Sequence, residues 1–176
     1  MLKMRVVGLL GLLAISGMAR ADLNDGLLAY YSFDDCTARD VSGNGMDGSI
    51  ENNVSCTQGI QGSKAIHLQG QGANESGGGH VIIPFIDFNK LDNYSACVWV
   101  NEVDMSFFHG EAYFSYGTGG EGELTIGHFA EGPDINAKRN LYFKKGMESI
   151  MVPFDYDDIN KFTHYCLTYS KSTLYA

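Results

Sequence analysis

The sequence predicts an all-β fold: one domain of short antiparallel strands, arranged as a two-sheet sandwich or a barrel. The first observation is that short apolar runs recur along the chain, without the long helical spacing of apolar residues that α-helices require. The second is the abundance of glycine, with 22 residues against only 3 prolines. Glycine-rich loops separate the apolar runs, as turns separate strands.

Nine runs are predicted as strands, because each combines apolar or aromatic residues with flanking turn residues. In chain order they are Leu27–Phe33, Lys64–Leu68, His80–Phe85, Tyr94–Val100, Ala112–Tyr116, Glu123–Phe129, Asn140–Lys144, Glu148–Val152 and Phe162–Ser170. The residues Ser172–Ala176 resemble the start of one more strand, so we expect the domain to be truncated at its C-terminus.

The beginning of the chain has the pattern of a secretory signal peptide. A basic start and an apolar run from Val6 to Ile15 precede the small residues Ala19 and Ala21. The run is too short to cross a membrane, which needs about 20 apolar residues. We therefore expect residues 1–21 to be removed and residues 22–176 to form one domain. The expected location is secreted, extracellular or periplasmic, with no membrane insertion after cleavage.

The predicted mature chain is strongly acidic. Three of the 12 basic residues lie before Asp22, which leaves 9 basic residues against 21 acidic ones and a net charge of −12. Such a surface repels phosphate backbones, and no basic patch with interleaved aromatic residues is present, so we expect no nucleic-acid partner. The acidity suits a soluble exported protein and is compatible with cation binding.

All four cysteines lie in the predicted mature chain: Cys36, Cys56, Cys97 and Cys166. An even number in an exported chain indicates two disulfides, for which three connectivities are possible. None of the cysteines belongs to a C-x-x-C pair, so the spacing does not favour a zinc or thioredoxin-like site.

A polar turn after the first predicted strand holds the densest group of potential metal-ligand oxygens. The segment Asp40–Gly45, followed by Glu51, approximates the spacing of an EF-hand calcium loop. Neither flank has helical spacing, so an EF-hand is not expected. Two alternatives remain: a glycine turn closed by side-chain hydrogen bonds, or a β-type loop that binds calcium through Asp40 and Asn44.

Several segments, in order, are similar to strands of one family. The segment Ala29–Asp34 and the turn at Asp40–Gly48 are similar to the first strand and turn of that family's domain. Its later strands are similar to Gly62–Leu68, Val81–Pro84, Tyr94–Val100, Phe162–Ser170 and Leu174–Tyr175. Together these segments resemble laminin-G-like domains of the concanavalin A-like lectin and glucanase superfamily. The resemblance implies a two-sheet antiparallel jelly-roll sandwich that lacks its C-terminal strands here.

The resemblance is closest to the pentraxin branch of that superfamily. The segment His164–Tyr169 resembles the signature H-x-C-x-[ST]-W, with Tyr169 in place of tryptophan. This resemblance implies the disulfide pairs Cys97–Cys166 and Cys36–Cys56, and a structural role for His164. It does not imply the two-calcium pentraxin site, whose main ligands would follow Ala176.

The resemblance implies a secreted, non-catalytic binding or adhesion module for carbohydrate or protein surfaces, with calcium as a possible aid. An alternative is a glucanase-like glycoside hydrolase that uses Glu102 and Asp104, which resemble the start of the Glu-x-Asp-x-Glu strand of β-glucanases. Retaining hydrolysis needs two carboxylates, and Ser106 occupies the place of the second glutamate. A further alternative is a purely structural domain of a larger exported protein.

The aromatic residues divide into a predicted core group and predicted surface candidates. Trp99 lies in a nearly continuous apolar run, which predicts that it is part of the core. The candidates for stacking on a sugar ring are Phe107, Phe108, Tyr113 and Tyr156. Formal glycosylation sequons begin at Asn53, Asn74 and Asn93.

Overall fold

The computed structural model describes residues 25–69, 77–103, 111–117, 124–130, 139–153, 159–170 and 173–176. In this part of the chain the fold is all-β, and the only helical elements are the short 3-10 turns η1 (Ile60–Gly62) and η2 (Phe88–Lys90). The strands are β1 (Ser49–Glu51), β2 (Val54–Gln58), β3 (Lys64–Leu68), β4 (His80–Ile82), β5 (Asn93–Asn101), β6 (Glu111–Tyr116), β7 (Leu124–Ala130), β8 (Arg139–Lys145), β9 (Glu148–Pro153), β10 (Phe162–Ser170) and β11 (Thr173–Tyr175).

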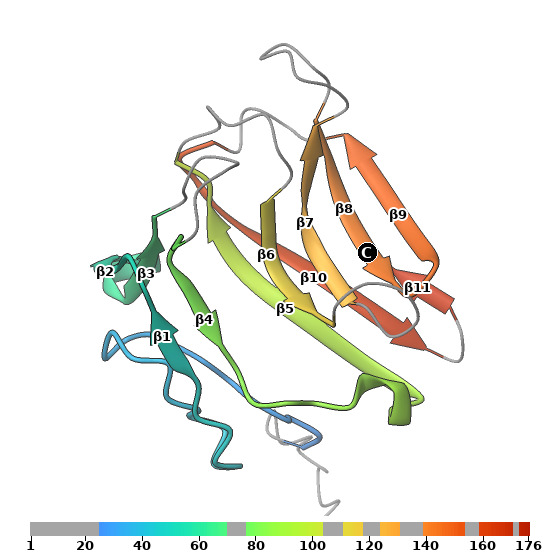
Figure 1. Ribbon diagram of the computed structural model, residues 1–176, viewed down its shortest axis with the longest axis horizontal. Coiled ribbons are helices and arrows are strands. Elements are labelled where there is room, and N and C mark those ends of the chain that lie inside the picture. Colours follow the sequence, from blue (N-terminus) through green and yellow to red (C-terminus); the bar gives the residue numbers. More distant parts are fainter. Residues whose placement is uncertain are drawn as a thin grey trace, which may run out of the picture.

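The strands form four small antiparallel sheets (Figure 1). The largest has the order β6-β7-β8-β9, and a three-stranded sheet has the order β11-β10-β5. The other two are the pairs β1-β4 and β2-β3. All strand pairs in the sheets are antiparallel. Most of them join strands that are consecutive in the chain, as short connections favour, whereas β1-β4 and β5-β10 join strands that lie far apart in the sequence.

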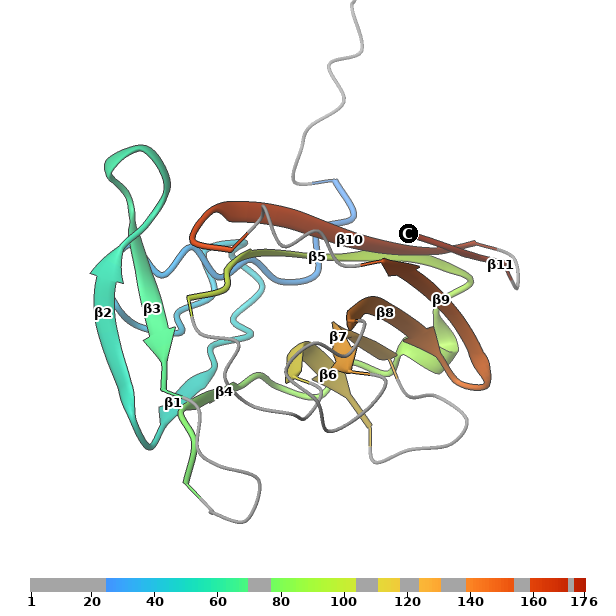
Figure 2. The ribbon, with the colours of Figure 1, turned by 90° about the horizontal axis from the view of Figure 1, so that it is seen from above.

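The two larger sheets lie one above the other, with the hydrophobic core between them (Figure 2). The buried core residues come from both sheets and from η2, and they are Phe88, Tyr94, Leu124, Ile126, Phe143, Tyr165 and Leu167. In β5 and β10 every second residue points toward this core, because successive side chains of a strand lie on opposite faces. The alternate residues from Asn93 to Trp99 and from His164 to Ser170 therefore lie on an outer face, on the side away from β6–β9.

Most predicted strands are confirmed. The bounds of β3 and β10 are those predicted, and five others (β5 to β9) differ from the prediction by one residue at one or both ends. The strand β4 ends at Ile82 rather than at Phe85, two residues before Pro84, which has no N–H group to donate to a neighbouring strand. The short strand predicted near the last residue is present as β11.

The predicted first strand, Leu27–Phe33, is wrong. Only a single bridge between Tyr31 and Asp40 forms there, because the hydrogen-bonding groups of this segment bind the following turn instead of a strand. The Tyr30 N–H donates to the Asp40 carboxylate at 2.9 Å, and the Val41 N–H donates to the Tyr30 carbonyl at 2.8 Å. A positive φ of 59° at Phe33 then turns the chain out of the extended conformation.

The sheets are small and open, and the jelly-roll sandwich stays a prediction from the sequence. No helix in the described ranges is long and apolar enough to cross a membrane. The predicted signal peptide, residues 1–21, lies outside the described residues.

Candidate functional site

The outer face of the sheet β5-β10-β11 is a continuous uncharged surface. We define the outer face as Asn93, Ser95, Cys97, Trp99, His164, Cys166, Thr168, Ser170 and Tyr175. The strand register places these residues opposite one another: Trp99 faces His164, Cys97 faces Cys166, Ser95 faces Thr168, and Thr168 faces Tyr175. No Asp, Glu, Lys or Arg is among them, although the whole chain has a formal net charge of −9.

Trp99 is the largest apolar group of the outer face. Its side chain is 55% exposed, so the prediction that it belongs to the core is wrong. The reason is the alternation of the strand: Val98 and Val100 point to the core, and Trp99 between them points outward. The His164 ring stacks on the indole, with 4.5 Å between ring centroids and 21° between the ring planes. This stacking favours the observed orientation of the exposed tryptophan.

The disulfides have the pairing that the resemblance implies. Cys97 and Cys166 are directly opposed on β5 and β10, with their Cα atoms 4.1 Å apart. Cys36 is linked to Cys56 of β2, across a sequence separation of 20 residues. Disulfides are typical of proteins in an oxidising compartment, and this agrees with the predicted export.

Polar groups continue the outer face beyond the disulfide. The hydroxyls of Ser95 and Thr168 are 2.7 Å apart, and the Ser170 hydroxyl donates to the Asn93 side-chain oxygen at 2.6 Å. From Trp99 to Asn93 the strand advances six residues, a length of about 20 Å at the usual rise per residue. The face is therefore a strip with Trp99 at one end and hydroxyl and amide groups, beside the exposed ring of Tyr175, toward the other.

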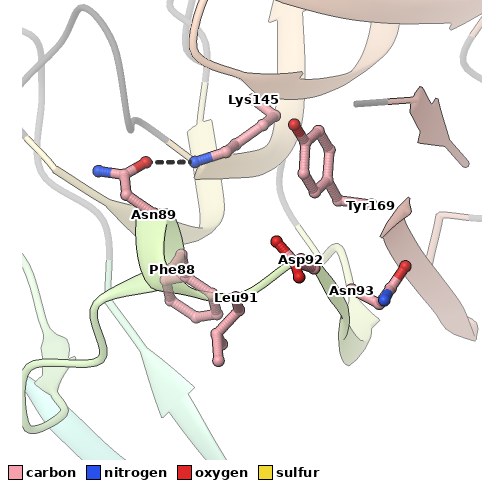
Figure 3. A pocket seen from close by; sticks show the side chains of 7 residues that line it. All are labelled: Phe88, Asn89, Leu91, Asp92, Asn93, Lys145 and Tyr169. Carbon is pink, nitrogen blue, oxygen red and sulfur yellow. Dashed lines mark hydrogen bonds between the residues drawn. The ribbon is translucent and has the colours of Figure 1, made fainter. Parts of the chain in front are cut away.

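A pocket of about 270 Å³ lies at one end of the core, next to η2 (Figure 3). Its lining residues are Phe88, Asn89, Leu91, Asp92, Asn93, Lys145 and Tyr169. The Lys145 ammonium group donates to the Asn89 side-chain oxygen at 2.8 Å and lies 5.8 Å from the centre of the Tyr169 ring. Burial lowers the pKa of Lys145, and the nearby Asp87 opposes this effect. The pocket is small for a ligand site, since such sites usually exceed about 300 Å³.

The predicted calcium ligands hold the N-terminal turn together. Asp40 is buried, and its two carboxylate oxygens accept four hydrogen bonds, from the backbone N–H groups of Tyr30, Ser42 and Met46 and from the Ser42 hydroxyl. These bonds, the one from the Tyr30 N–H first, lower the pKa of Asp40 far below its ordinary value. The Asn44 amide nitrogen donates to the carbonyls of Leu27 and Leu28 at 2.7 and 3.1 Å. A cation at this turn would have to compete with these donors for the Asp40 oxygens.

Glu102, the carboxylate proposed for the hydrolase alternative, lies just after β5. Its side chain is only 10% exposed, and its carboxylate is 3.7 Å from the Nδ1 atom of the buried His128. The Tyr113 hydroxyl is 3.1 Å from the same nitrogen, so Tyr113 packs inward instead of presenting a surface for a sugar. The other hydrolase candidate, Asp104, lies outside the described residues, as do Phe107, Phe108 and Tyr156.

Comparison with known proteins adds no assignment. No protein-family model, no curated protein and no solved structure matches the chain.

Proposed function

We propose that this protein is a secreted, non-catalytic binding module that holds a neutral carbohydrate chain against the outer face. The observation that carries the proposal is Trp99, an aromatic side chain that is 55% exposed on an open sheet and held in place by His164. An aromatic plane packs well against the apolar C–H face of a sugar ring, and a tryptophan is a common binding hot spot. A restrained side chain also loses little conformational freedom on binding.

The rest of the outer face suits the same class of ligand. Hydroxyl and amide groups of Ser95, Thr168, Asn93 and Ser170 extend from the aromatic end and offer hydrogen-bond partners for sugar hydroxyls. The absence of charged side chains from the face favours a neutral polysaccharide over a charged one. The length of about 20 Å fits an extended segment of several sugar units.

The proposed architecture is the jelly-roll sandwich of laminin-G and pentraxin-like domains. Two facing sheets with the core between them, and the two disulfides, support it. Calcium binding by Asp40 and Asn44 stays a prediction from the sequence, and the contacts of these side chains add no support for it. A rise of the melting temperature in millimolar calcium, absent from an Asp40→Asn variant, would support a calcium site there.

Affinity gel electrophoresis tests the carbohydrate proposal. The purified chain is run through gels that contain a β-glucan, xylan or mannan, beside Trp99→Ala and Phe85→Ala variants. Phe85 is the matched control, because it is 75% exposed but lies outside the outer face. We expect at least one polysaccharide to retard the wild type and Phe85→Ala. We expect the affinity of Trp99→Ala for that polysaccharide to be lower by about tenfold or more. The proposal is contradicted if all three proteins are retarded equally, or if no gel retards any of them.

The hydrolase alternative has a separate test. Turnover of laminarin or lichenan that is abolished by Glu102→Gln would replace the binding module by an enzyme. The buried position of Glu102 beside His128 does not favour this outcome, because a glycosidase carboxylate must reach the glycosidic oxygen.

A further inference from the structure

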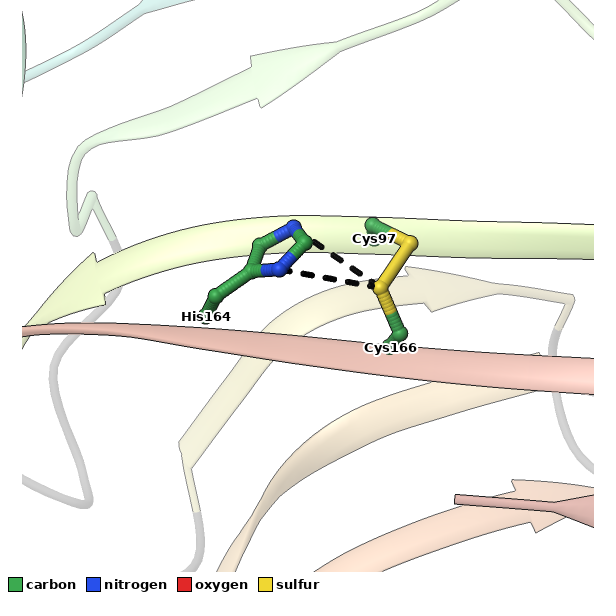
Figure 4. Close-up of side chains that lie close together, drawn as sticks. All are labelled: Cys97, His164 and Cys166. Atoms are coloured by element: carbon green, nitrogen blue, oxygen red, sulfur yellow. Dashed lines mark hydrogen bonds between the residues drawn. A yellow bond between two sulfur atoms is a disulfide. The ribbon is translucent and has the colours of Figure 1, made fainter.

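Three side chains with metal-ligating atoms converge on the outer face (Figure 4). The ligand atoms of Cys97, His164 and Cys166 all lie within 4.8 Å of one another, and this is the one such group of three among the described residues. The two ring nitrogens of His164 are 3.7 and 4.0 Å from the Cys166 sulfur. Two cysteines and one histidine form a soft ligand set, the kind that binds Zn²⁺ and similar metals.

The disulfide controls whether these sulfurs can bind a metal. Thiolates are the metal ligands, and in the structure both sulfurs are joined to each other. Cys97 and His164 are exposed, and the open outer face gives a reductant access to the bond. We propose that reduction of the Cys97–Cys166 disulfide converts the outer face into a Cys₂His site for Zn²⁺.

The chemistry is a two-electron thiol–disulfide exchange with a dithiol as the reductant. A thiolate of the dithiol attacks one protein sulfur, the S–S bond breaks, and the other cysteine leaves as a thiolate. The second thiol of the reductant then displaces the first cysteine, so the dithiol becomes a disulfide and the protein holds two reduced cysteines. Binding of Zn²⁺ to both sulfurs as thiolates releases the protons that they carry to solvent.

The observed geometry suits a tetrahedral site. Zinc–sulfur bonds of about 2.3 Å and zinc–nitrogen bonds of about 2.05 Å place sulfur and nitrogen about 3.6 Å apart and the two sulfurs about 3.8 Å apart. The shorter distance from a His164 nitrogen to the Cys166 sulfur is already 3.7 Å. The Cα atoms of the opposed cysteines are 4.1 Å apart, so side-chain rotation is enough to bring both sulfurs to one ion. The fourth position faces solvent.

The second disulfide provides a matched control. Cys36–Cys56 belongs to no such group of three ligands in the described part of the chain. Trp99 provides a local reporter, because it is the single tryptophan of the sequence and stacks directly on His164. The site shares residues with the proposed carbohydrate strip, but its test uses no carbohydrate, so either proposal can fail alone.

The test is a metal titration of the reduced chain. Purified protein is reduced with excess dithiothreitol, freed of reductant without oxygen, and titrated with Co²⁺ and then Zn²⁺. We expect one equivalent of Co²⁺ to give thiolate-to-cobalt charge-transfer absorption and to quench Trp99 emission, and Zn²⁺ to displace it. The oxidised protein and the reduced Cys97→Ser/Cys166→Ser variant show neither signal, and reduced Cys36→Ser/Cys56→Ser shows both. His164→Gln weakens Co²⁺ binding at least tenfold, as loss of a ligand should.

Circular dichroism of the same samples separates a folded site from binding by an unfolded chain. Three results overturn the proposal: no cobalt signal in the reduced Cys36→Ser/Cys56→Ser variant, unchanged affinity in His164→Gln, or loss of the β-sheet spectrum on reduction. In the last case the site does not exist in the folded protein.

Discussion

Replacing Tyr94 by phenylalanine tests the packing between the two larger sheets. Tyr94 lies on the inner face of β5, is only 9% exposed, and packs against the rings of Phe88 and Tyr169. Its hydroxyl is buried and has no hydrogen-bond partner among the described residues. A buried polar group without a partner costs about 1–3 kcal/mol. The variant should therefore be more stable than the wild type by about 1 kcal/mol, a rise in melting temperature of about 2–4 °C for a chain of this size.

The same substitution changes the dependence of stability on pH. Burial, with a smaller effect from Tyr169, raises the pKa of Tyr94 to about 12, whereas an unfolded chain has a tyrosine pKa of about 10. The folded state thus favours the neutral hydroxyl. Ionisation of the Tyr94 hydroxyl therefore destabilises the folded wild type: its stability is unaffected below about pH 10 and falls as the pH rises from there through the folded pKa. The advantage of Tyr94→Phe should therefore be larger at pH 11 than at pH 7.

Urea unfolding at both pH values, followed by circular dichroism, measures these differences. Tyr165→Phe is the comparison, because Tyr165 is 8% exposed on the same sheet face and its hydroxyl is not left buried without a partner. We expect no gain in stability from that variant. A Tyr94→Phe protein that is less stable than wild type by 1 kcal/mol or more, or whose gain does not depend on pH, refutes the reasoning.

Three further predictions concern stability. Leu167→Ala empties a fully buried position between the sheets and should lower the free energy of unfolding by about 3 kcal/mol in urea titrations, whereas Thr168→Ala, one residue along on the outer face, should cost less than about 1 kcal/mol. Because the pKa of Asp40 is lowered in the folded state, the ionised carboxylate stabilises the fold in full above the ordinary carboxyl pKa near 4, and this stabilisation declines as the pH falls below it. In thermal melts, Asp40→Asn should therefore lose less stability in acid than the wild type. The same acid profile in both proteins contradicts this prediction. Loss of the Cys36–Cys56 disulfide should lower the free energy of unfolding by about 3 kcal/mol and loss of Cys97–Cys166 by about 4 kcal/mol, because a disulfide that closes a longer loop restricts the unfolded chain more, and the sequence separations are 20 and 69 residues. Urea unfolding of the two double serine variants measures both values, and the reverse order would contradict this explanation.

The strands that the sequence predicts to within one residue at each end are rich in apolar residues, so each can be recognised from its own residues without knowing which strand it pairs with. The segments that became β3, β5 and β10 are of this kind. The segment Leu27–Phe33 is also rich in apolar and aromatic residues, but the N–H and C=O groups of Tyr30 bind Asp40 and Val41, and nothing in the segment's own residues reveals that competition. The strand β2 was missed for the opposite reason: it is an exposed, mostly polar strand whose stability depends on pairing with β3.

The outer face could have been predicted from two features together. Alternation along β5 places Ser95, Cys97 and Trp99 on one side, and a polar residue and an exposed disulfide indicate the solvent side. If Cys97 lies opposite Cys166 in an antiparallel pair, then Trp99 must lie opposite His164, as it does. The near-continuous apolar run around Trp99 indicates a core position only when this register is ignored, because Val98 and Val100 face the core and Trp99 between them does not.

A fluorescence titration with soluble polysaccharide tests the central claim most directly, because the only tryptophan of the sequence lies in the proposed binding strip. The β-glucan, xylan or mannan that retards the protein in gels is added to the oxidised chain, and the emission of Trp99 and its quenching by acrylamide are followed. The account predicts a saturable change in emission and protection of Trp99 from acrylamide, with an unchanged response in Phe85→Ala. Binding of the polysaccharide that leaves both the emission and the quenching of Trp99 unaltered would contradict it.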